Sequence, residues 1–440
     1  MNSLYNYLIL PALSFIISLA KLFNPKLRER EGIVKQQLKA SNLNIRRNAP
    51  TIWFHAASMG EFEQAKPVIE LIKKSNAKVN IVCSFFSPSG YDTQKNYAFA
   101  DETLYLPFDL KKNVIKFLDL VKPDLAVFIR YDIWRNYLSE LHNREIPAYL
   151  INATAPRSKA LRSFIGLKSF TRGNYALFKK IFAMSEGDYS YFKSLSLPDK
   201  VIQSSDSRFD RIIEKVEEAK NAPIAPKELI NSGKKIFLLG SSWPPDEELA
   251  IRALFKINPA LSDSLQLIIV PHEPTPDCIA RLRGSFKESV LLSEILGGIN
   301  NGAVETLKKQ AMDKTIIVDS IGHLLKLYSL ADVAHVGGAF GAGVHSVTEP
   351  AGYGIPLSCG PKYKNSPDAV RLVGEGALTP VETPEDMAKL LTLLLENPGV
   401  RKERGARAAA YVYSGKGASA AIVENIFDEL SSFRLDKSLK

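Results

Sequence analysis

Two runs of alternating strand-like and helix-like segments constrain the fold of this 440-residue chain more than any other feature. In the first half, short apolar runs typical of buried strands lie at 51–55, 78–86, 124–129, 148–151 and 180–184, and helical stretches lie between them, for example at 61–74. Strands that alternate with helices predict a parallel, doubly wound sheet.

The same alternation restarts after residues 217–234, a polar stretch with Pro and Gly that is typical of a linker. We therefore expect one Rossmann-like domain at 25–222 and another at 223–440, facing a cleft where open α/β sheets bind ligands. The second domain has predicted strands at 235–239, 266–270, 315–318, 333–336 and 356–358, and predicted helices at about 246–256, 321–330, 346–353, 366–373 and 384–395.

The amino terminus carries an almost entirely apolar segment from Tyr7 to Ala20, which extends to Phe23. That is about the length needed to cross a bilayer. Basic residues follow it and none precedes it, so the positive-inside rule puts the bulk of the chain in the cytoplasm, and we expect a membrane anchor or interfacial helix over 1–24. Two alternatives stay open: a cleaved signal peptide, although a basic first region is missing, and a helix that docks on a domain or lies in the membrane interface.

Composition narrows the class of partner. The formal net charge is +10 and the pI is about 9.2, which favours anionic partners such as phosphates or acidic lipids, although a merely basic soluble protein has the same balance. Nucleic acid is disfavoured because no zinc-finger spacing, RNP-like motif or dense basic arm occurs. The three cysteines, Cys83, Cys278 and Cys359, are far apart, which fits a reducing compartment without disulfides.

The turn between the first predicted strand and its helix reads His55-Ala-Ala-Ser-Met-Gly-Glu61. Ser58 and Glu61 have the spacing of a capping box, so one interpretation is that Glu61 only caps the helix. The other is catalytic. A carboxylate in the first helical turn is favoured in its ionised form by the helix dipole, and it could accept a proton from a sugar hydroxyl.

A glycine-rich turn, 337–350, follows the predicted strand 333–336. Its glycines permit close approach of a ligand to the backbone, and the following helix could face a phosphate. Ser346 and Glu349 again have capping-box spacing, so a purely structural interpretation stays open. The turn matches neither the G-x-G-x-x-G pattern nor a P-loop.

Three further turns could offer groups to a ligand. Residues 240–248 could present backbone N–H groups to a phosphate, although an ordinary helix start explains them too. His272 follows the next strand, and Ser320 to His323 begin another helix. No D-x-D sequence occurs, so a metal-bridged sugar nucleotide has no obvious ligand pair, and we expect no metal site.

Taken together and in this order, these motifs resemble those of the Kdo transferases (3-deoxy-D-manno-octulosonic acid transferases of lipopolysaccharide synthesis). The resemblance runs from the N-terminal segment to about residue 375. Its markers are WFHAASMGEFEQAKP at 53–67, FFSPSGYD at 85–92, LPFD at 106–109, RYDIW at 130–134, SDSRFDRI at 205–212, GSSWPPDEE at 240–248, VDSIGHLLKLYSLADVAHVGG at 318–338 and GVHSVTEPAGYGIPLSCGP at 343–361.

The resemblance implies a glycosyltransferase of the GT-B fold on the cytoplasmic side of the inner membrane. It implies CMP-Kdo as donor, the 6′-hydroxyl of a lipid A precursor (lipid IVA) as acceptor, inversion at the anomeric carbon, and no cofactor or required metal. By position, Glu61 is the catalytic base, with Ser58 and Gly60 on the acceptor side. The donor-side residues are Ser241, Ser242, His272, Ile321, Gly322, His345, Ser346 and Glu349.

Several positions depart from the commoner family pattern. His272-Glu273 stands where many relatives have Arg-His, Ser346 stands where Asn is usual, and His323 stands where Glu is frequent. The usual aromatic near Asn365 and Ser366 is missing. Two other functions compete with Kdo transfer: another enzyme of the same fold, such as a sugar-nucleotide epimerase, and a non-catalytic membrane-bound binder.

Overall fold

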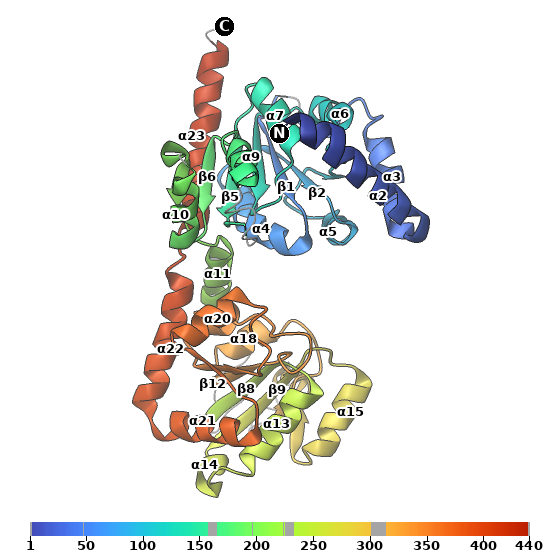
Figure 1. Ribbon diagram of the computed structural model, residues 1–440. Coiled ribbons are helices and arrows are strands. Elements are labelled where there is room, and N and C mark those ends of the chain that lie inside the picture. The colour runs from blue at the N-terminus through green and yellow to red at the C-terminus, as the bar shows by residue number, and fades with distance from the viewer. Residues whose placement is uncertain are drawn as a thin grey trace. The chain divides into compact units, whose positions relative to one another are not determined.

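The computed structural model describes residues 2–46, 48–156, 165–195, 197–222, 224, 233–300 and 314–438. The chain divides into two compact units: unit 1 consists of Met1–Asp210 and Gly415–Lys440, and unit 2 of Arg211–Ser414 (Figure 1). The prediction of two α/β domains is confirmed. Their bounds differ from the expected 25–222 and 223–440, and part of the expected linker, residues 223 and 225–232, lies outside the described residues.

Unit 1 is built on a seven-stranded parallel sheet in the order β3-β2-β1-β4-β5-β6-β7. Its central strands are buried along their whole length, which explains why they appear in the sequence as unbroken apolar runs. The strands are β1 (Thr51–Ala56), β2 (Asn80–Phe85), β3 (Glu102–Tyr105), β4 (Leu125–Ile129), β5 (Ala148–Ala153), β6 (Lys180–Ala183) and β7 (Val201–Gln203).

Helices cover this sheet, and the last helix of the chain is one of them. In α23 (Ala418–Ser438), the side chains of Ile422 and Ile426 are fully buried in the same core as β1 and β4. Burying each such side chain contributes roughly 1.5–3 kcal/mol, which explains why residues 415–440 belong to unit 1. The other helices are α4 (Met59–Ser75), α5 (Pro88–Gln94), α6 (Lys111–Val121), α7 (Arg135–Asn143), α9 (Ile165–Tyr175), α10 (Glu186–Ser194) and α11 (Arg208–Asn221), of which α11 continues into unit 2.

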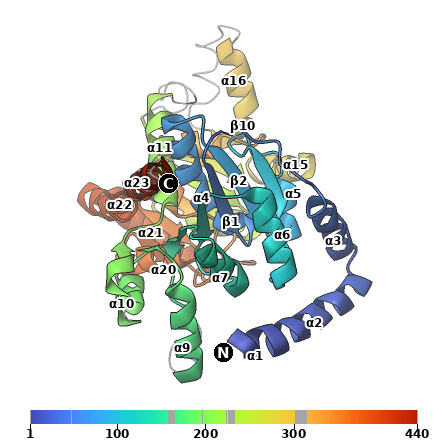
Figure 2. The same ribbon diagram turned by 90° about the horizontal axis from the view of Figure 1, so that it is seen from above.

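The amino terminus of unit 1 forms a series of helices: α1 (Asn2–Leu4), a π-helical turn η1 (Tyr5–Ile9), α2 (Leu10–Phe23) and α3 (Pro25–Gln37). Residues Tyr5–Phe23 are long and apolar enough to cross a membrane. The chain bends at Asn24, whose extended backbone ends α2 and whose side chain caps α3. Figure 2 shows α2 along the outside of unit 1, with α3 turning back toward α5.

Unit 2 repeats the plan with a seven-stranded parallel sheet in the order β10-β11-β9-β8-β12-β13-β14. Its strands are β8 (Lys235–Ser242), β9 (Leu265–Pro271), β10 (Ser289–Leu291), β11 (Thr315–Ile317), β12 (Val333–Val336), β13 (Leu357–Cys359) and β14 (Leu378–Pro380). Its helices are α13 (Pro244–Leu254), α14 (Pro259–Asp263), α15 (Pro276–Ser285), α16 (Leu292–Asn300), α18 (Leu324–Tyr328), α19 (Thr348–Gly352), α20 (Pro367–Gly374), α21 (Pro384–Glu396) and α22 (Pro398–Tyr413).

Candidate active site

The turn after β1 holds Glu61 at the carboxyl edge of the unit 1 sheet. Ser58 is the N-cap of α4, and its hydroxyl accepts from the Glu61 N–H at 3.5 Å. The Glu61 carboxylate in turn accepts from the Ala57 N–H at 2.7 Å. Ser58 therefore caps the helix, but the Glu61 carboxylate reaches the N–H of Ala57 rather than that of Ser58, so the reciprocal half of the expected capping box does not form. Gly60 is exposed, with open space where a Cβ would stand.

The surroundings of Glu61 disfavour the ionised form of its carboxyl group. Only 4% of the residue is exposed, and this burial raises the pKa of Glu61 above its ordinary value. The hydrogen bond from the Ala57 N–H lowers the pKa, whereas the charge of Asp132 raises it further. His55 and Arg130 lower the pKa of Glu61. A carboxylate with a raised pKa is a stronger proton acceptor than a free one once it is ionised.

The buried His55 and the half-buried Asp132 form a pair beside Glu61 that the sequence did not reveal. The Nε2 atom of His55 lies 2.8 Å from a carboxylate oxygen of Asp132, and its Nδ1 lies 2.9 Å from the hydroxyl of Ser84. The Ser84 carbonyl also lies 3.1 Å from Nδ1, and Trp53 donates its indole N–H to the Ser84 hydroxyl at 2.8 Å. Ser84 therefore holds one side of the His55 ring and Asp132 holds the other. The pair fixes the segment after β4 next to the turn after β1.

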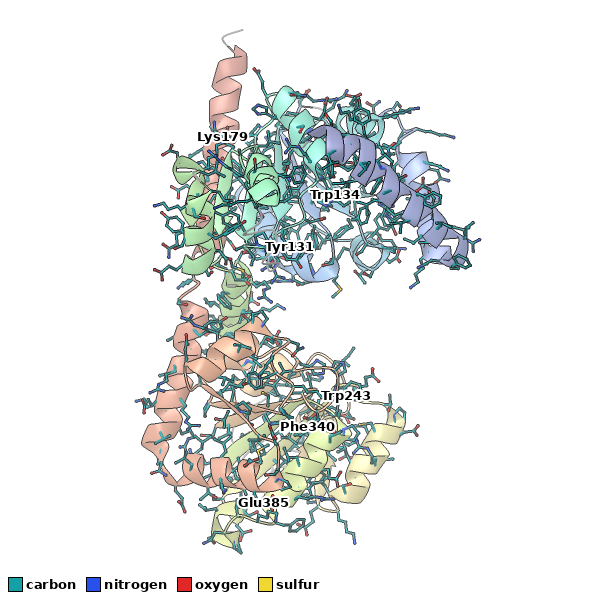
Figure 3. All side chains as sticks on the ribbon, in the orientation of Figure 1. Tyr131, Trp134, Lys179, Trp243, Phe340 and Glu385 are labelled. Atoms are coloured by element: carbon teal, nitrogen blue, oxygen red, sulfur yellow. The ribbon has the colours of Figure 1, made fainter. Side chains whose placement is uncertain are left out.

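Arg130 and Tyr131 begin that segment and line a pocket. Arg130 has a left-handed backbone (φ 67°), which is rare for a residue with a side chain, and its buried Nε has no hydrogen-bond partner within the described residues. The pocket has a volume of about 470 Å³ at the carboxyl ends of β4 and β5, and it is largely apolar, with Ile133, Phe170 and Tyr175 among its walls. Figure 3 labels Tyr131 and Trp134 from this segment.

A polar network holds α4 in place against the segment before α11. Ser207 donates its N–H to the side chain of Asn152 at 2.9 Å and its hydroxyl to the Gln64 carbonyl at 2.5 Å. The Gln64 side chain donates to Asp206 at 3.1 Å. The segment 205–212, a marker of the sequence resemblance, therefore positions the helix that carries Glu61.

In unit 2, the turn after β8 carries Ser241 and Ser242. Ser241 has a left-handed backbone (φ 50°). Ser242 is buried, its hydroxyl donates to Glu247 at 2.9 Å, and its carbonyl accepts from the His272 N–H at 3.0 Å. Ser242 therefore joins the ends of β8 and β9, and its side chain is engaged in the protein itself.

Three rings from three turns form a stack. His272 lies against Trp243, with centroids 5.1 Å apart, and against His345, with centroids 4.2 Å apart and planes 12° apart. Trp243 also donates its indole N–H to Nε2 of His345 at 3.0 Å. Burial lowers the pKa of His345 below its ordinary value, and the neighbouring His272 lowers it further, which agrees with a neutral His345 that accepts at Nε2.

The stack borders a pocket of about 340 Å³ that the glycine-rich turn completes. Its walls include Trp243, Gly338, Phe340, Gly343 and His345. Figure 3 labels Trp243 and Phe340 on this part of unit 2. The predicted donor residues Ser241, His272 and His345 thus belong to adjoining turns at the carboxyl ends of β8, β9 and β12.

Asp246, a residue that the sequence analysis did not single out, ties these turns together. It is fully buried, and one of its oxygens accepts from the N–H groups of Trp243 at 2.9 Å and Gly338 at 3.1 Å. The other oxygen lies 3.2 Å from Nε2 of His335. Gly337 must be glycine, because a Cβ there would lie 2.3 Å from the Ser241 carbonyl. Part of the glycine-rich signal therefore reflects packing between turns.

The end of the glycine-rich turn differs from the expected capping box. The helix α19 begins at Thr348, and its N-cap is Val347, which makes no side-chain cap. The exposed Ser346 instead has its hydroxyl 3.3 Å from that of Thr348. The structural interpretation of Ser346 and Glu349 as a capping pair is therefore wrong. Burial raises the pKa of Glu349 above its ordinary value, and Lys215 lowers it in part.

Ile321 and Gly322 lie in the turn between β11 and α18. Ile321 is 82% exposed, and Gly322 has a left-handed backbone (φ 92°). The helix begins at Leu324 rather than at 321, with His323 as its N-cap. Within the described ranges, no group of three or more His, Cys, Asp or Glu side chains could hold a metal ion.

Comparisons with known proteins bear on both halves of the chain. Residues 25–211 match the family profile described as 3-deoxy-D-manno-octulosonic-acid transferase (kdotransferase). The chain is 27% identical over 372 residues to the 3-deoxy-D-manno-octulosonic acid transferase of Chlamydophila psittaci, covering 83% of this chain and 80% of that protein. It is 24% identical to the enzyme of the same name from Haemophilus influenzae, covering 85% and 86%.

Solved structures share the fold. UDP-GlcNAc 2-epimerase from Neisseria meningitidis bound to UDP-GlcNAc aligns with a TM-score of 0.55 at 15% identity, covering 86% of this chain and all of that one. MurG from Acinetobacter baumannii aligns with a TM-score of 0.50 at 13% identity, covering 86% and 99%. At such low identity these alignments show the two-domain fold alone.

Proposed function

Because this chain is a relative of the Kdo transferases, we propose that it transfers Kdo in lipopolysaccharide synthesis, with CMP-Kdo as donor and the 6′-hydroxyl of a lipid A precursor (lipid IVA) as acceptor. The transfer inverts the anomeric carbon and uses no metal or other cofactor. The enzyme works at the inner membrane, with its catalytic domains on the cytoplasmic side. The observation that carries the proposal is Glu61, buried in the turn after β1 and held there by the Ala57 N–H.

Glu61 acts as the general base. It removes the proton from the acceptor hydroxyl as that oxygen attacks the anomeric carbon, and the transition state has oxocarbenium character, as in other glycosyl transfers. His55 and Asp132 keep the neighbouring segment in place, and both influence the pKa of Glu61. Ser58 orients the carboxylate by capping its helix, and Gly60 leaves space on the acceptor side.

The turns of unit 2 hold the donor. Ser241 and the start of α13 offer backbone N–H groups to the leaving phosphate, and Ile321 and Gly322 offer backbone groups to the cytosine base. Glu349 binds the ribose hydroxyls. His272 and His345 stand in the turns that face the donor, and their stack with Trp243 supports these roles because it preorganises the turns before a ligand arrives.

The raised pKa of Glu61 leads to a prediction about the pH profile. The base works only when ionised, so kcat/KM should fall as the pH drops through the pKa of Glu61, and this acidic limb should lie above the ordinary glutamate value because burial raises that pKa. Replacing Asp132 with asparagine removes a neighbouring charge that raises the pKa, so the limb should move toward lower pH. Initial rates measured across the acidic range with both proteins check the direction of the shift. An unmoved or upward-shifted limb would contradict Glu61 as the titrating base.

Mass spectrometry of the lipid product is the decisive experiment. Purified full-length enzyme is incubated with CMP-Kdo and lipid IVA, and the lipid should gain the mass of Kdo while CMP is released. An epimerase would change the donor without altering the lipid, and a binder would leave both unchanged. Either of these outcomes removes the proposed function.

A further inference from the structure

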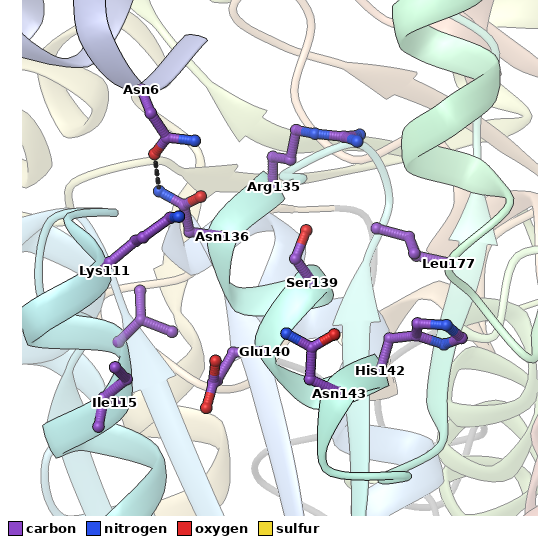
Figure 4. Close-up of a pocket in the computed structure, with 11 residues that line it drawn as sticks. Asn6, Lys111, Ile115, Arg135, Asn136, Ser139, Glu140, His142, Asn143 and Leu177 are labelled. Atoms are coloured by element: carbon purple, nitrogen blue, oxygen red, sulfur yellow. Dashed lines mark hydrogen bonds between the residues drawn. The ribbon is translucent and has the colours of Figure 1, made fainter. Parts of the chain in front are cut away.

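The amino-terminal helix is held to unit 1 at its first end by two hydrogen bonds. The Tyr5 hydroxyl donates to Asp109 at 2.7 Å, and the side chain of Asn136 donates to that of Asn6 at 2.8 Å, as Figure 4 shows for the second bond. Asp109 is itself fully buried and accepts from the N–H groups of Asn136 and Tyr137. The attachment point is therefore a rigid part of unit 1, at the start of α7.

The other end of the helix is held through α3, which follows it directly. The guanidinium group of Arg30 is buried and donates to the Phe86 carbonyl at 2.9 Å and to the Leu106 carbonyl at 2.6 Å. Lys21 in α2 pairs with Glu31 in α3 at 2.7 Å, which joins the two helices. Both ends of the apolar helix are thus fastened to the same folded unit.

This attachment conflicts with a helix that crosses a bilayer. The 19 residues Tyr5–Phe23 form a helix roughly 28 Å long, close to the ~30 Å of the hydrocarbon core, so a crossing helix would have its ends on opposite sides. Arg30 and Tyr5, however, bind Leu106 and Asp109, which lie within about 11 Å of each other along even a fully extended chain. A folded unit on one side of the membrane cannot hold both ends of a crossing helix.

The two faces of the helix differ in burial, as expected for a helix that lies in the plane of a membrane. Leu10, Ser14, Ile17 and Lys21 are buried or half-buried, and their spacing of three or four residues places them on one face. The opposite face is apolar and exposed, and includes Leu8 (66%), Phe15 (66%), Leu22 (67%) and Phe23 (86%). A continuous apolar face of this kind on a soluble domain marks a surface of interaction.

Basic side chains accompany this face. On α3, Lys26, Arg28 and Lys35 are exposed, and on α6 so are Lys111, Lys112 and Lys116. Lys111 lines a pocket of about 400 Å³ together with Asn6, so α6 lies beside the start of the helix (Figure 4). Among the acidic groups nearby, Glu31 is paired with Lys21 and Asp119 with Arg144, while Glu29 and, on α5, Asp92 are exposed. The excess of positive charge fits anionic lipid headgroups.

We propose that residues 5–23 form an in-plane membrane-binding helix. The helix face that carries Leu8, Phe15 and Leu22 lies at the boundary between the headgroups and the acyl chains of an anionic bilayer. Both ends of the helix stay bound to unit 1. The proposal rests on the proposed function only in taking a membrane lipid as the acceptor. Tyr5 also lies against Phe170, with ring centroids 5.7 Å apart, and Phe170 lines the pocket beside Arg130. The helix therefore brings the lipid surface next to that pocket.

Fluorophore depth distinguishes the two orientations. In full-length protein carrying Cys278→Ser, single cysteines replace Leu8, Phe15, Leu22 or Ser14, and each is labelled with an environment-sensitive dye. Vesicles of phosphatidylcholine and phosphatidylglycerol contain lipids brominated at different acyl depths. We expect the same shallow depth at positions 8, 15 and 22 and weak quenching at 14, which faces the protein. Deepest quenching at 15 with shallow quenching at 8 and 22 indicates a crossing helix and overturns the proposal, as does no quenching anywhere.

A second variant tests the apolar face without a label. Replacing Leu8, Phe15 and Leu22 together with glutamine should weaken binding to the same vesicles roughly tenfold or more. Phe255→Gln, which removes an 86% exposed aromatic from unit 2, should bind like the wild type. Equal binding of the triple variant overturns the proposal. Neither measurement needs turnover, so a failure here is distinct from a failure to transfer Kdo.

Discussion

Replacing Glu61 with glutamine should lower kcat for Kdo transfer by about 10³-fold, within the range of 10² to 10⁴ that general-base catalysis contributes. Glutamine keeps an oxygen that can accept from the Ala57 N–H, so the turn should keep its shape. It cannot take up the acceptor proton. Steady-state rates with CMP-Kdo and lipid IVA give the loss, and calorimetric titration with CMP should show unchanged binding.

Two controls separate catalysis from folding. Glu63→Gln changes a carboxylate in the same helix that pairs with Lys66, and it should leave kcat within about twofold. Thermal unfolding of Glu61→Gln should occur at the wild-type temperature or above, because burial raises the pKa of Glu61 and so disfavours the charge that glutamine lacks. A Glu61→Gln enzyme with near-normal activity would remove Glu61 from the mechanism.

Replacing Asp246 with alanine should have the second-largest effect, a loss of about 3 kcal/mol or more in the free energy of unfolding. The change leaves the N–H groups of Trp243 and Gly338 without their acceptor and His335 without its partner, and the bonds to Gly338 and His335 are buried. Because these bonds tie the turns after β8 and β12 together, CMP binding should weaken as well. Urea unfolding and calorimetric titration measure the two effects.

Asp386 offers a matched control for Asp246. It also occupies the third position of a helix and accepts from the N–H of its N-cap residue, Thr383, but it is only half-buried. Asp386→Ala should cost about 1 kcal/mol, the usual value for a lost cap, and should leave CMP binding unchanged. If both alanine variants lose the same small amount of stability, Asp246 is an ordinary cap rather than a link between turns.

The central strands could be predicted from the sequence, and the edge strands could not. Strands such as β1, β4 and β12 are buried on both faces, so each leaves an unbroken apolar run. The four strands that the sequence analysis missed, β3, β7, β10 and β14, have three or four residues each and lie at or next to the sheet edges. Length alone does not explain the difference, because the three-residue strands β11 and β13 were predicted. The four missed strands are only partly buried, so each mixes polar and apolar residues and leaves no unbroken apolar run.

The candidate site was only partly predictable, for a related reason. Ser58 and Glu61 are three residues apart, and a local rule relates them. His55 and Asp132 are 77 residues apart, and Asp246 and His335 are 89 apart, so only the order of the strands in each sheet brings them together. The sequence resemblance did include the RYDIW and GSSWPPDEE segments, which carry Asp132 and Asp246. That signal marked the segments without revealing their partners.

The assignment of α23 to unit 1 has a consequence for the order of synthesis. The chain leaves unit 1 after Asp210 and returns to it at Gly415, so unit 2 is one continuous insertion in unit 1. A growing chain can complete unit 2 as soon as its residues have left the ribosome. Unit 1, although it begins first, exposes the core surface that Ile422 and Ile426 cover until α23 has been made. The unit that carries Glu61 therefore reaches its finished form only after unit 2 and α23 have been made.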